Sequence, residues 1–291
     1  MSQVVKIDCL AIIGVGLIGG SFALALKQAG AVREVLGVGR SAANLALAQQ
    51  HGLIDRAVDF AEAAHADCIL LAMPVGETMT VLTQLAPHLK AGAVVTDAGS
   101  TKANVIAAAQ AAMGARFSDF VPGHPIAGSE CNGPLAARAD VFQARKVVLT
   151  PTPETRSDAQ ALVSALWTVT GAQVETLDAA LHDQVFAAVS HLPHLAAYAL
   201  VNELAQRENS AEFFRFAASG FRDFTRIAGS SPEMWRDIAL ANRDALLNEL
   251  DAYIAALQQL RGAVTSDDHQ TLLKIFSQAR SAREHWLNQQ P

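Results

Sequence analysis

The stretch Cys9–Gly20, CLAIIGVGLIGG, joins an apolar run to a glycine-rich turn and to the start of an alanine- and leucine-rich segment. The apolar run predicts a buried strand, and the segment after the turn has the composition of a helix. Between them Gly14, Gly16 and Gly19 form the pattern GxGxxG. In a strand–turn–helix context these glycines permit a tight turn, close approach of the backbone to a pyrophosphate, and packing of helix on strand. The context favours a dinucleotide site over an ordinary glycine-rich turn.

The residues that follow this turn and the next strand indicate which cofactor is bound. Leu17 and Ile18 open the predicted helix, where free N–H groups and the positive end of the dipole attract phosphates. The second strand leads into Gly39, Arg40 and Ser41, without the carboxylate that hydrogen-bonds the ribose of NAD. A guanidinium beside a hydroxyl suits a 2′-phosphate. We therefore expect NADP, with NAD possible; a surface role for Arg40 is the alternative.

Up to residue 176 short apolar runs alternate with longer segments of helical period, which is typical of an α/β fold. Most of these strands are apolar throughout, as in a parallel sheet buried on both faces. We predict a doubly wound, Rossmann-type domain over residues 1–176. The expected strands are Lys6–Ile13, Val35–Val38, Cys68–Ala72, Ala93–Asp97, Phe120–Pro122, Lys146–Thr150 and Gln173–Thr176, and the expected helices Leu17–Gln28, Ala42–Gln50, Gly76–Leu89, Lys102–Ala112 and Thr155–Thr170.

The remainder of the chain, residues 177–291, carries no strand signal and predicts a second, all-α domain. Ser231 before Pro232 is suited to cap a helix. The last helix reaches the end of the sequence, so we expect no appended regulatory domain. The expected helices are Asp178–Arg207, Ala211–Phe221, Pro232–Arg261 and Ser266–Asn288.

Length and composition agree with two globular domains. The chain has 291 residues, of which 51% are hydrophobic and 17% charged. A net charge of −6 without a basic cluster argues against a nucleic-acid partner. Cys9, Cys68 and Cys131 fit neither a disulfide framework nor a zinc site. No apolar run approaches the ~20 residues of a membrane span, and no cleavage region of a signal peptide is evident, so we expect a cytoplasmic protein without membrane contact.

Two polar segments follow predicted strands. TDAGSTK, Thr96–Lys102, lies at the carboxyl edge of the sheet, where doubly wound folds bind ligands. Its Ser100 is a candidate site residue, with helix capping as the alternative. PGHPIAGSE, Pro122–Glu130, holds His124 in what should be an irregular loop stiffened by proline and glycine. A neutral imidazole there could take a proton from a substrate hydroxyl during hydride transfer; a structural histidine is the alternative.

The helical half adds further candidates. SHLPH places His191 and His194 three residues apart on one helix face, with Pro193 suited to kink the helix. No third ligand is evident, so we expect no metal. The segment GFRDFTRIA supplies Arg226, which could hold a carboxylate bidentately, and Trp235 follows it.

These motifs in this order, over Gly14–Ala263, resemble the prephenate/arogenate (cyclohexadienyl) dehydrogenase family, which carries out an NAD(P)-dependent oxidative decarboxylation in tyrosine biosynthesis. The resemblance implies a Rossmann domain, a helical domain that forms a homodimer, and an active site between them that takes a small-molecule substrate. It assigns His124 to the substrate ring hydroxyl, Ser100 to a place beside it, and His194 and Arg226 to substrate binding. His191 and Trp235 then line or support the same pocket.

Two other classes of function are alternatives. The β-hydroxyacid dehydrogenases resemble one another in using a lysine on the helix between their domains. This chain has no lysine between Lys146 and Lys274, which disfavours that class. A non-catalytic NADP-sensing module would bind the cofactor but turn over no cyclohexadienyl acid.

Overall fold

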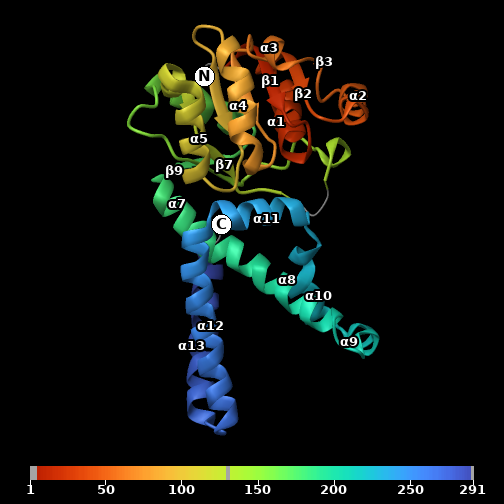
Figure 1. The fold of residues 1–291 in the computed structure, drawn as a ribbon, viewed down its shortest axis with the longest axis vertical. Helices are drawn as coiled ribbons and strands as arrows, with labels where there is room; N and C mark the ends of the chain where they lie inside the picture. Colours follow the sequence, from red (N-terminus) through yellow and green to blue (C-terminus); the bar gives the residue numbers. More distant parts are fainter. Residues whose placement is uncertain (1–4, 129–131, 290–291) are drawn as a thin grey trace. The chain divides into compact units, whose positions relative to one another are not determined.

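The computed structural model, which describes residues 5–128 and 132–289, has a six-stranded parallel sheet at the centre of its N-terminal half (Figure 1). The strand order reverses direction between β1 and β4, as in a doubly wound sheet. The predicted Rossmann-type fold is confirmed. In spatial order the strands are β3 (Arg56–Ala57), β2 (Val32–Val38), β1 (Ile7–Ile13), β4 (Cys68–Leu71), β5 (Val94–Asp97) and β6 (Phe120–Val121).

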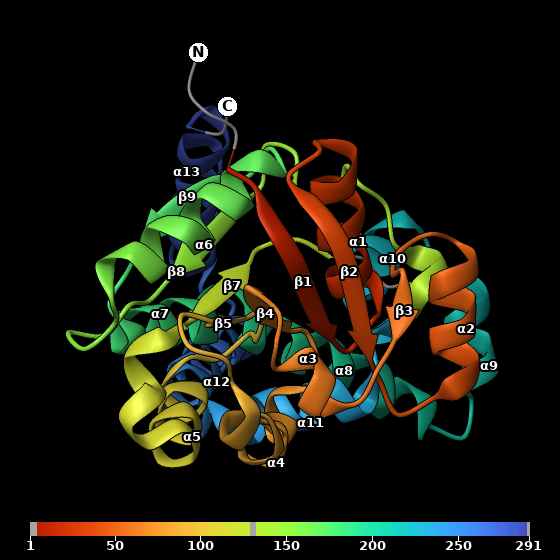
Figure 2. The ribbon, with the colours of Figure 1, turned by 90° about the horizontal axis from the view of Figure 1, so that it is seen from above.

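Helices cover both faces of this sheet (Figure 2). One face packs against α1 (Leu17–Gln28) and α6 (Ser157–Val169) through a core that contains Phe22 and Trp167. The other packs against α3 (Phe60–Ala63), α4 (Thr78–Leu85) and α5 (Ala103–Met113). α2 (Ala42–Gln50) follows β2. Because both faces are covered, the central strands need apolar residues at every position, as the sequence predicted.

A second sheet of three strands corrects the prediction of a loop around His124. It consists of β7 (Gly123–Pro125), β8 (Lys146–Leu149) and β9 (Gln173–Thr176). His124 lies on β7, antiparallel to β8 and opposite Val148. A three-residue strand between prolines has no periodicity of its own, so its pairing depends on β8, which lies more than 20 residues further along the chain.

The helical part of the first compact unit, Met1–Arg243, contains breaks that the periodicity did not predict. The helix expected over 178–207 spans Ala179–Ala205 with a π-helical turn before Pro193. The helices expected over 211–221 and 232–261 are each divided, the second at Asn242. The predicted cap of Ser231 is confirmed, because its Oγ accepts a hydrogen bond from Met234 N at 3.3 Å. The elements are α7 (Ala179–Phe186), the π turn Ala187–His191, α8 (Leu192–Ala205), α9 (Ser210–Phe216), α10 (Ser219–Thr225) and α11 (Pro232–Ala241).

The second compact unit, Asp244–Pro291, is a helical hairpin. α12 (Arg243–Thr265), all but its first residue in this unit, is followed after three residues by α13 (His269–Asn288). The carboxylate of Asp268 caps α13 by accepting a hydrogen bond from Thr271 N. The boundary between residues 1–176 and 177–291 stays a prediction.

The helix Ala179–Ala205 is long and apolar enough, by length and composition alone, to span a bilayer. The continuous apolar runs of the sequence did not reveal this property, because polar residues interrupt them. Three of those residues, His182, Asp183 and His191, are buried within the protein.

Candidate active site

Three positions of the turn after β1 are occupied by glycine, each for a different structural reason. Gly14 has φ +95°, and a Cβ there would lie 2.7 Å from Ala72 O. A Cβ on Gly19 would lie 2.6 Å from Gly14 O, so this position needs glycine for helix-on-strand packing. A Cβ on Gly16 would meet no protein atom within 4 Å. The space beside Gly16 is therefore open for a ligand, as a pyrophosphate site requires.

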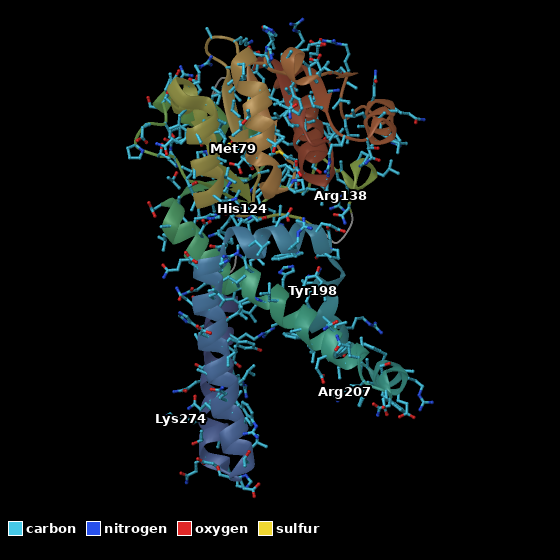
Figure 3. The ribbon with its side chains drawn as sticks, viewed as in Figure 1. Met79, His124, Arg138, Tyr198, Arg207 and Lys274 are labelled. Carbon is cyan, nitrogen blue, oxygen red and sulfur yellow. The ribbon has the colours of Figure 1, made fainter. Side chains whose placement is uncertain are left out.

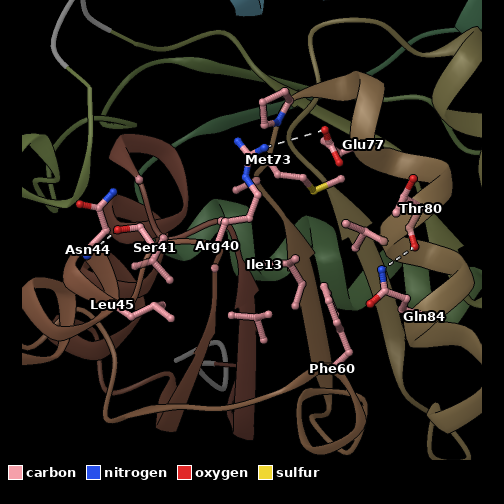
Figure 4. A pocket seen from close by; sticks show the side chains of 18 of the residues that line it. Ile13, Arg40, Ser41, Asn44, Leu45, Phe60, Met73, Glu77, Thr80 and Gln84 are labelled. Atoms are coloured by element: carbon pink, nitrogen blue, oxygen red, sulfur yellow. Dashed lines mark hydrogen bonds and ion pairs between the residues drawn. The ribbon is translucent and has the colours of Figure 1, made fainter.

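A cavity of about 590 Å³ adjoins this turn (Figure 4). It is lined by Gly14 and Gly16, by Arg40 and Ser41 after β2, and by residues after β4. α1 begins with Leu17 and Ile18, and no side chain of residues 5–128 or 132–289 caps its N-terminus, so its first N–H groups are suited to a phosphate. The cavity lies at the switch between β1 and β4, where doubly wound folds bind nucleotides.

Arg40 and Ser41 both reach the cavity, as the cofactor prediction required. The Arg40 side chain is 85% exposed, and its Nη1 lies 4.0 Å from Glu77 Oε1 (Figure 4). Ser41 Oγ accepts a hydrogen bond from Asn44 N and so also caps α2. Glu77, which precedes α4, brings to the cavity a carboxylate that the strand-end pattern did not predict.

His124 lies where the α/β part meets α7, in contact with the side chain of His182 (Figure 3). His124 Nδ1 is 2.8 Å from His182 Nε2, and His182 Nδ1 is 2.8 Å from Asp183 Oδ1. Phe186 packs against both rings. Three side chains from β7 and α7 thus form one buried, hydrogen-bonded chain.

The N-terminus of α5 anchors this chain. The carboxylate of Asp183 accepts hydrogen bonds from Lys102 N and Ala103 N, both at 2.8 Å. The helix begins at Ala103, so Ser100 does not cap it, and Asp183 from another element fills that role. The buried Lys102 ammonium pairs with Asp97 and donates to Gly123 O at 2.6 Å, which fixes β7 beside β5.

Burial sets the charge of the site. Burial, together with the nearby charges of His182, Lys102 and His191, holds the pKa of His124 well below its usual range. The pKa of His182 is also lowered, mainly by burial. The pKa of Asp183 is lowered because hydrogen bonds from His182, Ala103 and Lys102 outweigh its burial. At neutral pH both histidines are neutral and Asp183 is a carboxylate.

His191 occupies a second buried position on the π-helical turn, a kind of turn that is frequent at functional sites. Its Nδ1 lies 3.1 Å from Asn242 Nδ2, and Asn242 Nδ2 also donates to Asp183 O at 2.8 Å. The carbonyl of Ser100 lies near enough to oppose the fall in pKa of His191, which burial lowers to about 4. His191 Nε2 is buried without a hydrogen-bond partner among the described residues.

His194 stacks on Trp235, with ring centroids 3.5 Å apart. His194 Nδ1 lies 2.9 Å from Ser190 O, and since a carbonyl only accepts, Nδ1 carries the proton. Burial chiefly, and the charge of Arg226, lower the pKa of His194. The neutral ring therefore presents a bare Nε2, which accepts hydrogen bonds and does not donate them.

The structure thus gathers Ser100, His124, His191, His194 and Trp235, with Arg226 acting on His194, and it places the glycine turn, Arg40 and Ser41 around the cavity. Sequence reasoning missed the roles of His182, Lys102 and Asn242. His182 and Asp183 belong to the segment HDQ, His182–Gln184, which by itself does not indicate a role for either residue. No group of three or more metal-binding side chains occurs within residues 5–128 and 132–289; Cys131 lies outside the described residues.

Comparison with known proteins identifies the family of this chain. A model of the prephenate dehydrogenase nucleotide-binding domain matches residues 22–176, and one of the prephenate dehydrogenase dimerization domain matches residues 178–278. The chain is 38% identical to the cyclohexadienyl dehydrogenase of Zymomonas mobilis, over 94% of both chains, and 36% identical to the prephenate dehydrogenase of Bacillus subtilis, over 95% of this chain and 76% of that protein.

A solved structure of prephenate dehydrogenase from Aquifex aeolicus, in complex with hydroxyphenyl propionate and NAD+, superposes with a TM-score of 0.91. It is 32% identical and matches 97% of this chain and 99% of its own. Sequence and fold agree, and the chain belongs to the prephenate dehydrogenase family of oxidoreductases.

Proposed function

We propose that this protein catalyses the oxidative decarboxylation of prephenate to 4-hydroxyphenylpyruvate, in tyrosine biosynthesis, with hydride transfer to a nicotinamide cofactor. The observation that carries the proposal is the neutral, buried His124 at the head of the His182–Asp183 chain, in a protein whose glycine turn adjoins a cavity suited to a nucleotide. When bound, the nicotinamide ring accepts the hydride. The residues described above supply orientation and proton handling, and no metal or covalent nucleophile enters the scheme.

The reaction involves two opposite carbons of the substrate ring. The C–H bond of the first breaks with its electron pair leaving as hydride, and His124 takes the proton of the hydroxyl on the same carbon. The bond from the opposite carbon to its carboxylate then breaks, its electrons complete the aromatic ring as CO2 leaves, and the phenolate oxygen takes the proton back from His124. Aromatisation drives this step, so His124 needs correct position and protonation more than unusual basicity. Ser100 lies beside the reacting hydroxyl in this scheme, and Arg226 holds a carboxylate.

We assign NADP as the preferred cofactor. Arg40 is exposed at the cavity, is held only at 4.0 Å by Glu77, and can turn to a 2′-phosphate. Glu77 repels the same phosphate, so Glu77→Gln should improve kcat/KM for NADP about threefold to tenfold and leave that for NAD within twofold. Arg40→Asp should reverse the preference. Wild-type efficiency with NAD equal to or above that with NADP would overturn the assignment.

The helical domain is proposed to form a homodimer, and the protein is proposed to act in the cytoplasm on a small-molecule substrate. Exposed apolar side chains on α8, α12 and α13 support the dimer, as does the description of the matched domain. Cys9 and Cys68 are free thiols, with pKa values raised by burial to about 11 and about 12, which fits a reducing compartment.

Steady-state kinetics with prephenate and arogenate, each crossed against NAD and NADP, test the reaction, the substrate and the cofactor together. Prephenate should be turned over, and arogenate at a lower or equal rate. Cofactor binding without turnover of either acid would instead indicate a sensing module.

A further inference from the structure

The proton positions in the chain of His124, His182 and Asp183 follow from one end. Asp183 is a carboxylate that accepts two backbone N–H groups, so His182 Nδ1 must donate to it. His182 is neutral, so its Nε2 carries no proton and accepts a hydrogen bond from the N–H of His124 Nδ1. His124 is neutral as well. Its remaining nitrogen, Nε2, therefore carries a lone pair.

A second set of bonds gives His191 the opposite arrangement. Asn242 faces the carbonyl oxygen of Asp183, which can only accept, so the amide atom at that contact is the NH2 group. The same NH2 group faces His191 Nδ1 at 3.1 Å, and Nδ1 must accept. A neutral His191 then carries its proton on Nε2. That N–H is buried without a partner among the described residues, and the nearby Ser100 carbonyl makes no hydrogen bond of normal geometry to it.

We propose that Asp183, through its carboxylate and its own carbonyl, holds the two histidines in opposite tautomers: His124 offers a bare Nε2 that accepts a proton, and His191 offers an Nε2–H that donates to a substrate oxygen. His182 and Asn242 transmit this control. All three are positioning residues, because each acts through a histidine ring.

The opposite tautomers give two nearby imidazoles different roles. A base must present a lone pair at the moment of hydride transfer, and a ring that donates there cannot take a proton. A buried N–H without a partner is unfavourable until an acceptor binds, so His191 is suited to a substrate carboxylate, keto or hydroxyl oxygen. The charged and titratable groups around His124 are His182, Lys102, His191 and, behind them, Asp183 and Asp97.

The direct test is 15N–1H correlation NMR of the histidine side chains in the full-length enzyme without ligands, because protonated and bare ring nitrogens have well-separated 15N shifts. His124, His182 and His191 would be assigned from His→Gln variants. We expect Nδ1–H on His124 and His182 and Nε2–H on His191. An Nε2–H on His124, an Nδ1–H on His191, or two protons on either ring at pH 7.5 would overturn the inference.

A kinetic test uses near-isosteric variants. His182→Gln can still donate to Asp183 and accept from His124, whereas His182→Met can do neither. We expect His182→Met to lower kcat with prephenate on the order of 10- to 100-fold with little change in KM, and His182→Gln to recover most of that loss. Equal losses in the two variants would show a structural role only.

Asn242→Leu tests the other arm. It should release the His191 tautomer and weaken binding of hydroxyphenyl propionate about tenfold, with cofactor affinity unchanged. Unchanged binding of this probe would overturn the donor role of His191. The kinetic and binding tests rest on the proposed function, but the NMR measurement does not. The expected tautomers in a protein that does not turn over prephenate would overturn the proposed function alone. Other tautomers in an active enzyme would overturn this inference alone.

Discussion

We predict that turnover depends most on His124, which is buried and neutral. His124→Asn should lower kcat with prephenate by ~100-fold or more, and it should leave the cofactor dissociation constant within about twofold. Fluorescence titration with the reduced cofactor and steady-state kinetics measure the two quantities. Near-normal turnover in the variant would make His124 structural.

The pH profile gives a second reading of the same residue. Activity needs the neutral ring, so kcat/KM rises with pH as His124 loses its proton. Because burial lowers the pKa of His124, and that of His182 behind it, the acidic limb should lie below pH 6.5, the ordinary histidine value. A limb centred at or above pH 6.5 would contradict this environment. As a control, the pH profile of kcat/KM is measured again in D2O and in a second buffer.

We predict that substrate choice also depends on one residue, His194. A protonated imidazole there could donate to a keto or carboxylate oxygen of prephenate, but the Nδ1–H donates to Ser190 O and the neutral ring can only accept at Nε2. Donation needs the protonated ring, whose formation burial and Arg226 oppose. The ratio of kcat/KM for prephenate to that for arogenate should therefore rise as the pH falls below 6.5, the ordinary histidine value.

His194→Phe, which keeps a ring on Trp235 but has no polar atom, should flatten that dependence. A ratio that stays constant in the wild type, or a slope that survives in His194→Phe, would remove His194 as the selector. Loss of Arg226 should weaken both substrates alike, because they share a carboxylate.

At the scale of elements, we predict that two glycines of the turn between β1 and α1 have different roles: Gly19 is needed for folding and Gly16 for cofactor binding. Gly19→Ala places a Cβ 2.6 Å from Gly14 O and Ile12 Cγ2, so we expect a fall in the free energy of unfolding of about 1–3 kcal/mol. Gly16→Ala meets no protein atom and should leave stability within ~0.5 kcal/mol, while the methyl group weakens cofactor binding tenfold or more. Denaturant unfolding and cofactor titration compare the pair. Equal cofactor affinity in Gly16→Ala and wild type would mean that the pyrophosphate lies elsewhere.

At the scale of the whole molecule, the prediction is a homodimer through the helical domain. The hairpin of α12 and α13 exposes apolar side chains three residues apart on each helix, among them Ile254, Leu257, Leu273 and Phe276. A group of such residues on neighbouring helical turns is typical of an interaction surface. Sedimentation equilibrium at about 10 μM should give a dimer, and Phe276→Glu should weaken it at least tenfold.

Gln278→Glu is the matched control for the dimer, because it adds the same charge two residues away on a different face of α13. It should leave the dimer intact. A wild-type monomer at micromolar concentration, or equal dissociation by both variants, would contradict the prediction.

Local sequence determined much of this protein. The apolar runs predicted the central strands, the turn at Gly14–Gly19 predicted the nucleotide cavity, and the ordered motifs indicated the family. These features depend on residues near one another in the chain, where the periodicity of apolar side chains and the conformational freedom of glycine act directly.

Only the tertiary structure decided how the site works. His124 contacts His182 58 residues away, Asn242 contacts Asp183 59 residues away, and Asp183 caps the start of α5 from 81 residues away. The break at Asn242 interrupts a pattern that is helical on both sides, because the packed structure uses the amide to bond Asp183 and His191. A hydrogen bond between distant residues depends on how the elements pack, and the proton on a histidine depends on that bond; neither is encoded in the residues on either side of it.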